Sequence, residues 1–264
     1  MRTTINDLSV FLSGNKASKP ILFVHGFPFD HTMWHSQIDE FNKDYFCISY
    51  DIRGLGESPA GDGQFTMESS VDDLEIIIEE LKLNKPILCG LSMGGYISLR
   101  ALERMEERFS ATILCDTRSE ADNNEGRFKR AAGIKRINKE GLALFAKDFI
   151  TNCFGDVFKQ MKGDDLQKII EKSSRFNPAG VKGSLLAMLS RSDTTASLRK
   201  INIPTLLICG EKDALTPPSI MKDMFHKINN AEFVEIPKAG HMTPIENPLL
   251  VNKSIRDFLT RNKV

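Results

Sequence analysis

The chain has 264 residues, which is long enough for one large α/β domain or for two small domains. Lysine plus arginine and aspartate plus glutamate both total 35, so the formal net charge is zero and no global field favours nucleic acid or an anionic membrane. No apolar stretch approaches membrane-spanning length and the N-terminus has no apolar signal region, so we expect neither nucleic acid nor a membrane as a partner.

Five cysteines are scattered along the chain, and four of them fall inside apolar, strand-like runs: Cys47, Cys89, Cys115 and Cys209. Buried cysteine behaves as a small hydrophobe, and scattered thiols suit a reducing compartment. None of the cysteines has metal-ligand spacing. We therefore expect a cytoplasmic protein that uses no metal and no other cofactor.

Three apolar runs near the N-terminus predict strands at 8–12, 21–24 and 45–50, because they are rich in β-forming residues and bounded by turn signals. The second run ends in His-Gly-Phe-Pro at 25–28, and the third ends in Asp-Ile-Arg-Gly-Leu-Gly-Glu-Ser at 51–58. Both loops therefore follow the carboxyl end of a predicted strand.

Helical patterns separate these strands from the next one. A helix-like segment lies around Trp34 and Phe41. Thr66 is a suitable N-cap for a second helix, because apolar residues then recur at alternating steps of four and three from Met67 to Leu81. That spacing places the apolar side chains on one face of an amphipathic helix.

The run at 87–91 and the turn after it have the features of a nucleophile elbow. The apolar run ends in Gly-Leu-Ser-Met-Gly at 90–94, and a helical pattern covers 96–105. This strand, turn and helix form the context that a G-x-S-x-G pattern requires. The glycines allow strand and helix to pass closely while a strained turn pushes the Ser92 hydroxyl out of the sheet.

The alternation of strands and helices stops between about 118 and 198, after a strand at 111–115. The helical patterns in this interval cover 127–137, 142–150, 165–176 and 181–189. No strand run interrupts the interval, and the strand pattern resumes after it. We interpret 118–198 as a helical lid inserted into a core formed by 1–117 and 199–264; a second, independently folded domain is the alternative.

The last part of the chain restores the alternation, with strands predicted at 205–209 and 232–236 and a helix from Met221 to Ile228 between them. A closing helix starts at Asn247-Pro248, an N-cap followed by a first-turn proline. Strands that alternate with helices predict an α/β fold with a mostly parallel central sheet flanked by helices. Ligands bind beyond the carboxyl ends of such strands.

A serine hydroxyl becomes a good nucleophile only when a base takes its proton and a carboxylate orients that base. The expected chain order for this elbow is serine, acid, histidine. His241 follows the last predicted strand and is the candidate base for Ser92, while Asp213 follows the strand before it and is the preferred acid. Asp116, after an earlier strand, is an alternative position for the acid, but it better suits an anchoring role at the lid entrance with Arg118.

Two backbone amides are candidate donors to an oxyanion. One belongs to Met93, directly after the serine, and the other to Phe27, in the turn after the second strand. His25 in the same turn is better interpreted as a residue that bonds neighbouring loops than as a base. Side chains that could line a substrate pocket, although each alone also suits simple packing, are Trp34, Phe128, Phe145, Phe149 and Met188.

Taken together, the motifs at 25–28, 51–58, 90–95, 203–213 and 240–241 resemble those of the α/β-hydrolase superfamily nearly end to end. The chain is most similar to small lidded esterases that include 3-oxoadipate enol-lactonases and cofactor-free haloperoxidase-like hydrolases, and the run at 115–122 resembles one in lactonase-like members. The resemblance implies the α/β-hydrolase fold with a lid. Serine rather than aspartate at position 92 departs from haloalkane dehalogenases, and His-Gly-Phe-Pro departs from the lipase-type oxyanion loop.

The residues predict a serine hydrolase that cleaves a small or medium carboxylic ester or lactone through an acyl-enzyme, with Ser92, Asp213 and His241 as its triad. Carbon–carbon bond hydrolysis and perhydrolysis on the same residues are alternatives, as is a ligand receptor of the same fold without turnover. The sequence does not specify the substrate, and it leaves the oligomeric state open, including a homo-oligomer.

Overall fold

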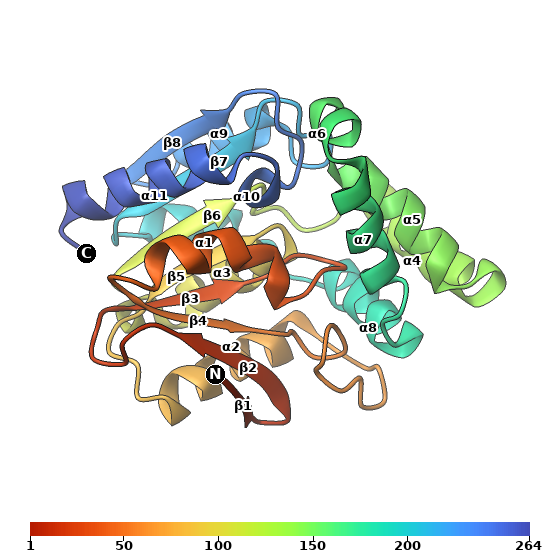
Figure 1. The fold of residues 1–264 in the computed structure, drawn as a ribbon, viewed down its shortest axis with the longest axis horizontal. Helices are drawn as coiled ribbons and strands as arrows, with labels where there is room; N and C mark the ends of the chain where they lie inside the picture. The colour runs from red at the N-terminus through yellow and green to blue at the C-terminus, as the bar shows by residue number, and fades with distance from the viewer.

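An eight-stranded sheet crosses the molecule in the order β1-β2-β4-β3-β5-β6-β7-β8 (Figure 1). The computed structural model describes residues 1–264. The strands are β1 (Arg2–Ile5), β2 (Leu8–Ser13), β3 (Pro20–Val24), β4 (Phe46–Tyr50), β5 (Ile87–Leu91), β6 (Ala111–Cys115), β7 (Thr205–Gly210) and β8 (Ala231–Ile236). β2 pairs antiparallel with both β1 and β4, and all the other neighbouring strands are parallel. The sheet is therefore mostly parallel, as the sequence predicts.

The inner strands are apolar on both faces because helices cover both sides of the sheet. β3, β4, β5 and β6 are buried at every residue. Parallel strands in such a sheet read as continuous apolar runs rather than as alternating ones. The strand order reverses direction at β3, which pairs with β4 on one side and β5 on the other. The carboxyl ends of β3 and β5 thus form a switch point, where ligands bind in open α/β sheets.

Helices α1 and α11 lie on one face of the sheet, and α2, α3 and α9 lie on the other (Figure 1). The helices of the two layers are α1 (His35–Phe41), α2 (Met67–Glu80), α3 (Met93–Met105), α9 (Pro218–Phe225), α10 (Thr243–Glu246) and α11 (Pro248–Asn262). Short 3₁₀ segments cover His31–Trp34, Glu106–Arg108 and Thr195–Lys200. Thr66 caps α2 with a reciprocal capping box to Ser69, which fixes the start of that helix where the sequence predicts it.

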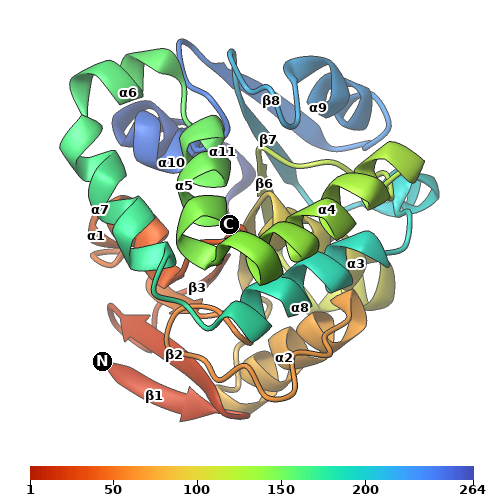
Figure 2. The same cartoon turned by 90° about the vertical axis from the view of Figure 1, so that its right-hand side faces the viewer.

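Five helices between β6 and β7 form a separate layer over the carboxyl edge of the sheet, and Figure 2 views this layer face on. They are α4 (Asn124–Glu140), α5 (Leu142–Cys153), α6 (Asp156–Met161), α7 (Gly163–Ser173) and α8 (Pro178–Leu189). We call residues 118–198 the helical insert. One apolar core of 71 buried residues contains side chains of both the sheet and the insert, including Phe145 and Leu185. The insert therefore packs on the sheet rather than around a core of its own.

The predicted strands are confirmed to within one residue at each end, and three elements were not predicted. β1 has the sequence Arg-Thr-Thr-Ile and is mostly exposed, so it carries no apolar signal and exists as the outer strand of a hairpin with β2. α6 and α10 are short, with six and four residues. α3 begins at Met93 directly after Ser92, three residues before the predicted start.

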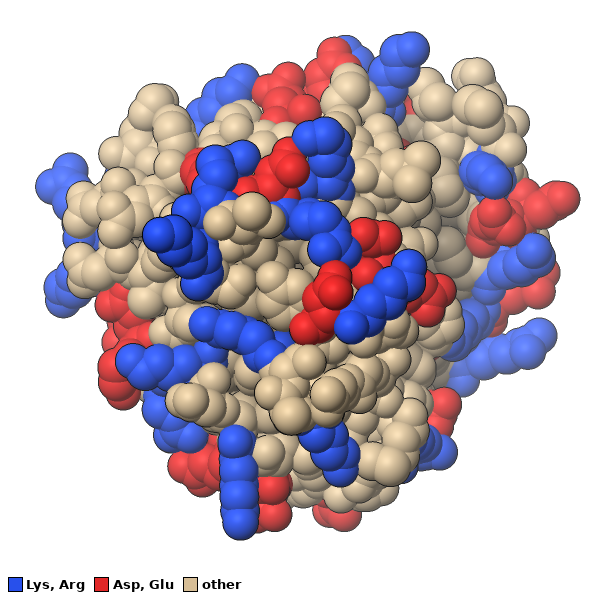
Figure 3. Space-filling model, turned by 60° about the vertical axis from the view of Figure 1, so that its left-hand side comes forward, with Lys and Arg blue, Asp and Glu red and all other residues tan.

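No helix of the structure is long and apolar enough to cross a membrane. On the face shown in Figure 3, basic and acidic side chains are interspersed. Ion pairs join charged side chains of the protein surface, such as Arg256 with Glu40 and Asp44. This mixing agrees with the balanced charge of the chain.

Helix α3 crosses the sheet so closely that its first turn has no space for a side chain at position 94. A Cβ built at Gly94 would lie 2.1 Å from the carbonyl oxygen of Val24 in β3. We expect Gly94→Ala to lower the free energy of unfolding by about 1–3 kcal/mol, the usual cost of forcing an extra carbon into a packed site. Urea unfolding followed by far-UV circular dichroism measures this loss.

Gly163→Ala is the matched control for that substitution. Gly163 is the first residue of α7, and a Cβ built there meets no atom within 4 Å. Because alanine favours the helix and restricts the unfolded chain, we expect stability to stay level or rise by about 0.5–1 kcal/mol. Equal losses in both variants would show that close packing at Gly94 does not constrain the turn.

Candidate active site

Ser92 occupies a strained turn between β5 and α3. Its backbone has φ 53° and ψ −112°, in the left-handed region that residues with a side chain rarely adopt. Three hydrogen bonds hold the turn: the Ser92 amide donates to the Cys115 carbonyl at 3.0 Å, and the Ser92 carbonyl accepts from the Tyr96 amide at 3.0 Å and the Thr117 hydroxyl at 2.8 Å. The strain is thus held in place by β6 and by the first turn of α3.

The hydroxyl of Ser92 reaches His241, and His241 reaches Asp213. The Ser92 Oγ to His241 Nε2 distance is 2.8 Å, and the His241 Nδ1 to Asp213 Oδ2 distance is also 2.8 Å. His241 and Asp213 are 4% and 3% exposed, so the hydrogen bond between them is shielded from water, whereas Ser92 is half-buried at the edge of a cavity. The three side chains that the sequence selects therefore lie in one line, in the order nucleophile, base and acid that acyl transfer uses.

The carboxylate of Asp213 is held by its own loop. Its Oδ1 accepts from the amides of Leu215 and Thr216, and its Oδ2 accepts from the Thr216 hydroxyl at 2.6 Å as well as from His241. Burial by itself would raise the pKa of Asp213, but the attraction of His241 and these hydrogen bonds outweigh it and lower the pKa to about 2. Asp213 is consequently ionised near neutral pH and presents a negative charge to Nδ1 of His241.

Glu246 clamps both sides of the His241 loop. Its carboxylate accepts from the amides of Gly240 and Met242, the two neighbours of His241, and from Gly155 in the insert. The amide of His241 itself donates to the carbonyl of Cys153 at 2.8 Å. Burial raises the pKa of Glu246 despite these donors. The loop that carries the imidazole is therefore fastened to the insert as well as to the core.

The turn after β3 lies beside Ser92, as the sequence predicts for an oxyanion loop. A Cβ built at Gly26 would lie 3.5 Å from the Cβ of Ser92. The amide of Phe27 donates to no protein acceptor, and Met93, as the first residue of α3, has no intrahelical acceptor for its amide. Two unused backbone donors thus flank the hydroxyl.

His25 holds this turn in place through two hydrogen bonds of its ring. Its Nδ1 lies 2.8 Å from the Gly26 carbonyl and its Nε2 accepts from the Ile52 amide at 2.9 Å, so the ring bonds two neighbouring loops. Burial lowers the pKa of His25, which keeps the imidazole neutral in this arrangement. His25 therefore has no nitrogen left for Ser92, in agreement with the linking role expected for it.

Asp116 ends β6 but does not reach His241 by a hydrogen bond. Its carboxyl accepts from the Gly210 amide at 2.8 Å and from the hydroxyl of Thr243, and burial together with nearby Asp213 raises its pKa well above the usual range. Asp116 thus ties the end of β6 to the end of β7 and to the loop after His241. The expected partnership of Asp116 with Arg118 at the lid entrance is not present, because the donors come from the core.

A cavity of about 470 Å³ opens beside Ser92 and His241, between the sheet edge and the insert. Its apolar wall includes the predicted side chains Phe145, Phe149 and Met188 together with Phe27 and Leu185. The rings of Phe27 and Phe149 meet edge to face at 5.2 Å between centroids, and Phe145 stacks on Phe149. The cavity therefore offers an apolar surface directly next to the Ser92 hydroxyl.

Two side chains predicted for this pocket lie elsewhere. Trp34 is fully buried in the core and packs against Phe23 with ring centroids 5.3 Å apart. Phe128 is 74% exposed, because α4 buries only Gly133 and Ile137 and directs position 128 outward. The prediction that Trp34 and Phe128 line the pocket is therefore wrong.

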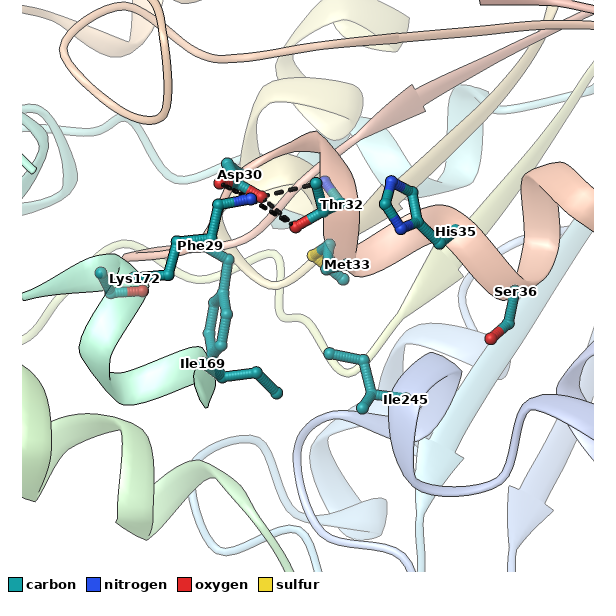
Figure 4. A pocket seen from close by; sticks show the side chains of 10 residues that line it. Phe29, Asp30, Thr32, Met33, His35, Ser36, Ile169, Lys172 and Ile245 are labelled. Atoms are coloured by element: carbon teal, nitrogen blue, oxygen red, sulfur yellow. Dashed lines mark hydrogen bonds and ion pairs between the residues drawn. The ribbon is translucent and has the colours of Figure 1, made fainter. Parts of the chain in front are cut away.

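A second cavity, of about 170 Å³, lies between α7 and the segment that leads into α1 (Figure 4). Lys172 of α7 reaches across it, with its Nζ 2.6 Å from Asp30 and 2.9 Å from the Thr32 hydroxyl. None of Ser92, His241 and Asp213 lines this cavity. It marks a place where an ion pair joins the insert to the core rather than a second reactive site.

Two groups of side chains have ligand atoms close enough for a metal ion: Asp30, His31 and Asp51, and Asp116, Cys209 and Asp213. In the first group, Asp51 already accepts from His31 and from the Glu57 amide. In the second, protein donors already occupy both carboxyl groups. These hydrogen bonds account for both groups without an ion.

Residues 19–248 match the family model described as alpha/beta hydrolase fold. The chain belongs to this family. The resemblance to enol-lactonases is also confirmed: the chain is 29% identical over 241 residues to 3-oxoadipate enol-lactonase 1 of Acinetobacter baylyi, which covers 91% of this chain and 88% of that protein. A putative 2-succinyl-6-hydroxy-2,4-cyclohexadiene-1-carboxylate synthase of Bacillus subtilis is 30% identical over 94% of this chain and 92% of that protein.

Among solved structures, this hydrolase is similar to a thermophilic esterase from Thermogutta terrifontis, studied with malate bound. The two chains superpose with a TM-score of 0.93 and 33% sequence identity, and the match covers 100% of both. Relatives described as lactonases and esterases support hydrolysis of esters or lactones as the general activity.

The lowered pKa of Asp213 predicts a specific loss of stability in acid. Because its pKa falls from 3.8 to about 2 on folding, the ionised carboxylate stabilises the fold above pH 4, and this contribution disappears as the pH falls towards 2. We expect the stability gap between wild type and Asp213→Asn to narrow by about 1 kcal/mol from pH 5 to pH 3. Urea unfolding at both pH values measures it; a constant or wider gap would contradict the assignment.

The clamp at Glu246 predicts a second effect on stability. Glu246→Gln leaves one carbonyl oxygen for three backbone donors and turns an amide group towards them, so we expect a loss of about 1–3 kcal/mol. Urea unfolding measures this loss, and amide hydrogen exchange at Gly240 and Met242 should accelerate. Glu171→Gln on α7, where the exposed glutamate bonds only Gln167, is the control and should change neither readout.

Proposed function

We propose that this hydrolase is a serine carboxylic-ester or lactone hydrolase that works through an acyl-enzyme. The proposal rests on two hydrogen bonds of 2.8 Å, one between Ser92 and His241 and one between His241 and Asp213, beside the cavity of about 470 Å³. The strained turn at Ser92, which costs folding energy, also supports a role for the hydroxyl beyond packing.

In the first half of the proposed reaction, the Ser92 oxygen attacks the substrate carbonyl carbon while His241 Nε2 takes the hydroxyl proton. Asp213 holds the imidazole by its Nδ1 and balances the positive charge that forms on it. His241 then gives the proton to the departing alcohol oxygen, which leaves the acyl group on Ser92. In a lactone, the departing oxygen stays attached to the acyl chain.

In the second half, water attacks the acyl carbon and gives its proton to His241, which returns it to Ser92 as the acid leaves. The amides of Phe27 and Met93 would donate to the oxyanion that forms in both halves, each contributing about 3 kcal/mol by comparison with other enzymes. Because these donors are fixed by a strand end and a helix start, they require no reorganisation during the reaction.

We also propose that the helical insert, residues 118–198, acts as a lid over this site. It supplies half of the hydrophobic residues that line the cavity, and its Gly155 and Cys153 touch the loop that carries His241. The cavity volume of about 470 Å³ suits a small or medium ester or lactone. All five cysteines are free and buried, which fits a cytoplasmic location.

The proposal predicts that a fluorophosphonate probe labels the wild-type protein at one serine. Ser92→Ala should abolish labelling and lower p-nitrophenyl acetate hydrolysis by at least about 1000-fold, because the nucleophile is lost. Labelling is read by intact-protein mass spectrometry, and circular dichroism checks the fold.

Ser98→Ala is the matched control, since Ser98 lies on the same helix and bonds only the Gly94 carbonyl. This variant should be labelled like the wild type. A wild-type protein that is folded but neither labelled nor active on p-nitrophenyl esters and enol-lactones of graded size would favour a ligand receptor over an enzyme.

A further inference from the structure

The larger cavity contains three cationic side chains on its wall, and two of them are neutralised. Lys129 Nζ lies 2.8 Å from Glu125, and Arg130 Nε lies 3.0 Å from Asp122. Their carboxylate partners also line the cavity. The third cation on the cavity wall is Arg118.

Arg118 has no carboxylate within ion-pair distance. Its Nη2 donates to the neutral carbonyl of Leu215 at 3.3 Å, and its Nε is shielded from solvent without any acceptor. An arginine that is only partly exposed and has one neutral partner keeps its full positive charge, because guanidinium does not lose its proton in proteins. The cavity therefore carries one uncompensated positive charge on its wall.

The backbone around Arg118 fixes this charge close to the reactive hydroxyl. The preceding residue, Thr117, donates its hydroxyl to the Ser92 carbonyl at 2.8 Å. Leu215, which holds the guanidinium, donates its amide to Asp213. Arg118 is thus tied to both ends of the Ser92–His241–Asp213 line, and its position relative to a bound acyl group is set by the same loops.

The neighbouring acidic side chains do not neutralise the charge of Arg118. Asp122, an acidic wall residue with a buried carboxylate, is already shared between Arg130 and Arg191, whose Nη1 lies 2.8 Å from it. The guanidinium of Arg191 also lies over the Tyr96 ring at 4.2 Å. Two arginines thus share one carboxylate, so Asp122 is already engaged and forms no ion pair with Arg118.

We propose that Arg118 binds a carboxylate carried by the substrate, so that the preferred esters or lactones are those of acids or alcohols with a second, ionised acid group. The proposal rests on the proposed hydrolase function and names its substrate class. The planar guanidinium fork matches a carboxylate, and the apolar wall opposite would hold the carbon chain between the two functional groups. Arg118 is on this view a specificity-determining residue rather than a member of the proton relay.

The test compares ester pairs that differ only by a carboxylate in place of a methyl group. Monomethyl adipate with methyl hexanoate places the charge on the acyl side, and 4-acetoxybenzoate with 4-methylphenyl acetate places it on the leaving group. Binding to the Ser92→Ala protein, which cannot turn over, is measured by NMR titration. Turnover by the protein with Ser92 intact is measured in parallel as kcat/KM.

We expect Arg118→Met to lower the preference for the charged member by about tenfold in at least one pair, in binding and in kcat/KM alike. Arg118→Lys should restore part of the preference, since it keeps the charge but loses the fork. If Arg118→Met fails to fold, Arg118→Gln, which keeps a donor for Leu215, takes its place. Arg136→Gln is the control: Arg136 is paired with Glu140 and Asp148 outside the cavity, so the preference should not change.

A change below about twofold in both pairs, or an equal change in Arg136→Gln, would overturn the carboxylate assignment. The two proposals fail separately. Loss of turnover for every ester while Ser92→Ala still binds the charged member through Arg118 would remove the hydrolase function and leave the anion site. Turnover with a substrate preference that does not depend on Arg118 would support the hydrolase function and remove the carboxylate site.

Discussion

The close approach of α3 to the sheet is the constraint on which the rest of the site depends. Gly94 packs against the Val24 carbonyl, and Gly95 lies against Thr117, so the chain between β5 and α3 must turn sharply. Ser92 absorbs that turn with a positive φ, and its hydroxyl leaves the plane of the sheet. The same packing brings the ends of β3, β5 and β6 together. One steric requirement therefore positions the proposed nucleophile, the oxyanion turn and the loop that carries Arg118.

The position of His241 in the proposed proton relay also depends on the helical insert. Three backbone amides, on Gly155, Gly240 and Met242, share the carboxylate of Glu246, and His241 donates its own amide to Cys153. Movement of the insert would therefore disturb the imidazole unless these bonds broke first. The helices over the cavity are in this respect part of the proposed active site, because they help to position His241 as well as lining the cavity.

The sequence alone was sufficient to predict the sheet and its two helical layers, because strand ends and turn motifs are local signals. The same signals selected Ser92, His241 and Asp213, which lie within hydrogen-bond distance of one another in the structure and whose catalytic role stays a proposal. Glu246 was missed because a single acid at the end of a four-residue helix has no periodic pattern, and one of its three partners, Gly155, lies 91 residues away in the chain. Trp34 and Phe128 were misplaced for a related reason. Which way an aromatic side chain points depends on the packing of the insert and the core, and α4 has too few buried residues to reveal its inner face.

Asp116 and Asp213 show why residue type at a strand end does not by itself assign a role. They end neighbouring strands and are both buried, yet the pKa of Asp116 is raised and that of Asp213 is lowered to about 2. The difference lies in the partners. Asp213 receives the hydrogen bonds of Thr216 and faces His241, whereas Asp116 faces Gly210 and Thr243 and feels the repulsion of Asp213. Two carboxyl groups so close cannot both ionise at low cost. The raised pKa of Asp116 and the lowered pKa of Asp213 therefore follow from the burial, hydrogen bonds and charges around each carboxyl group rather than from its place at a strand end.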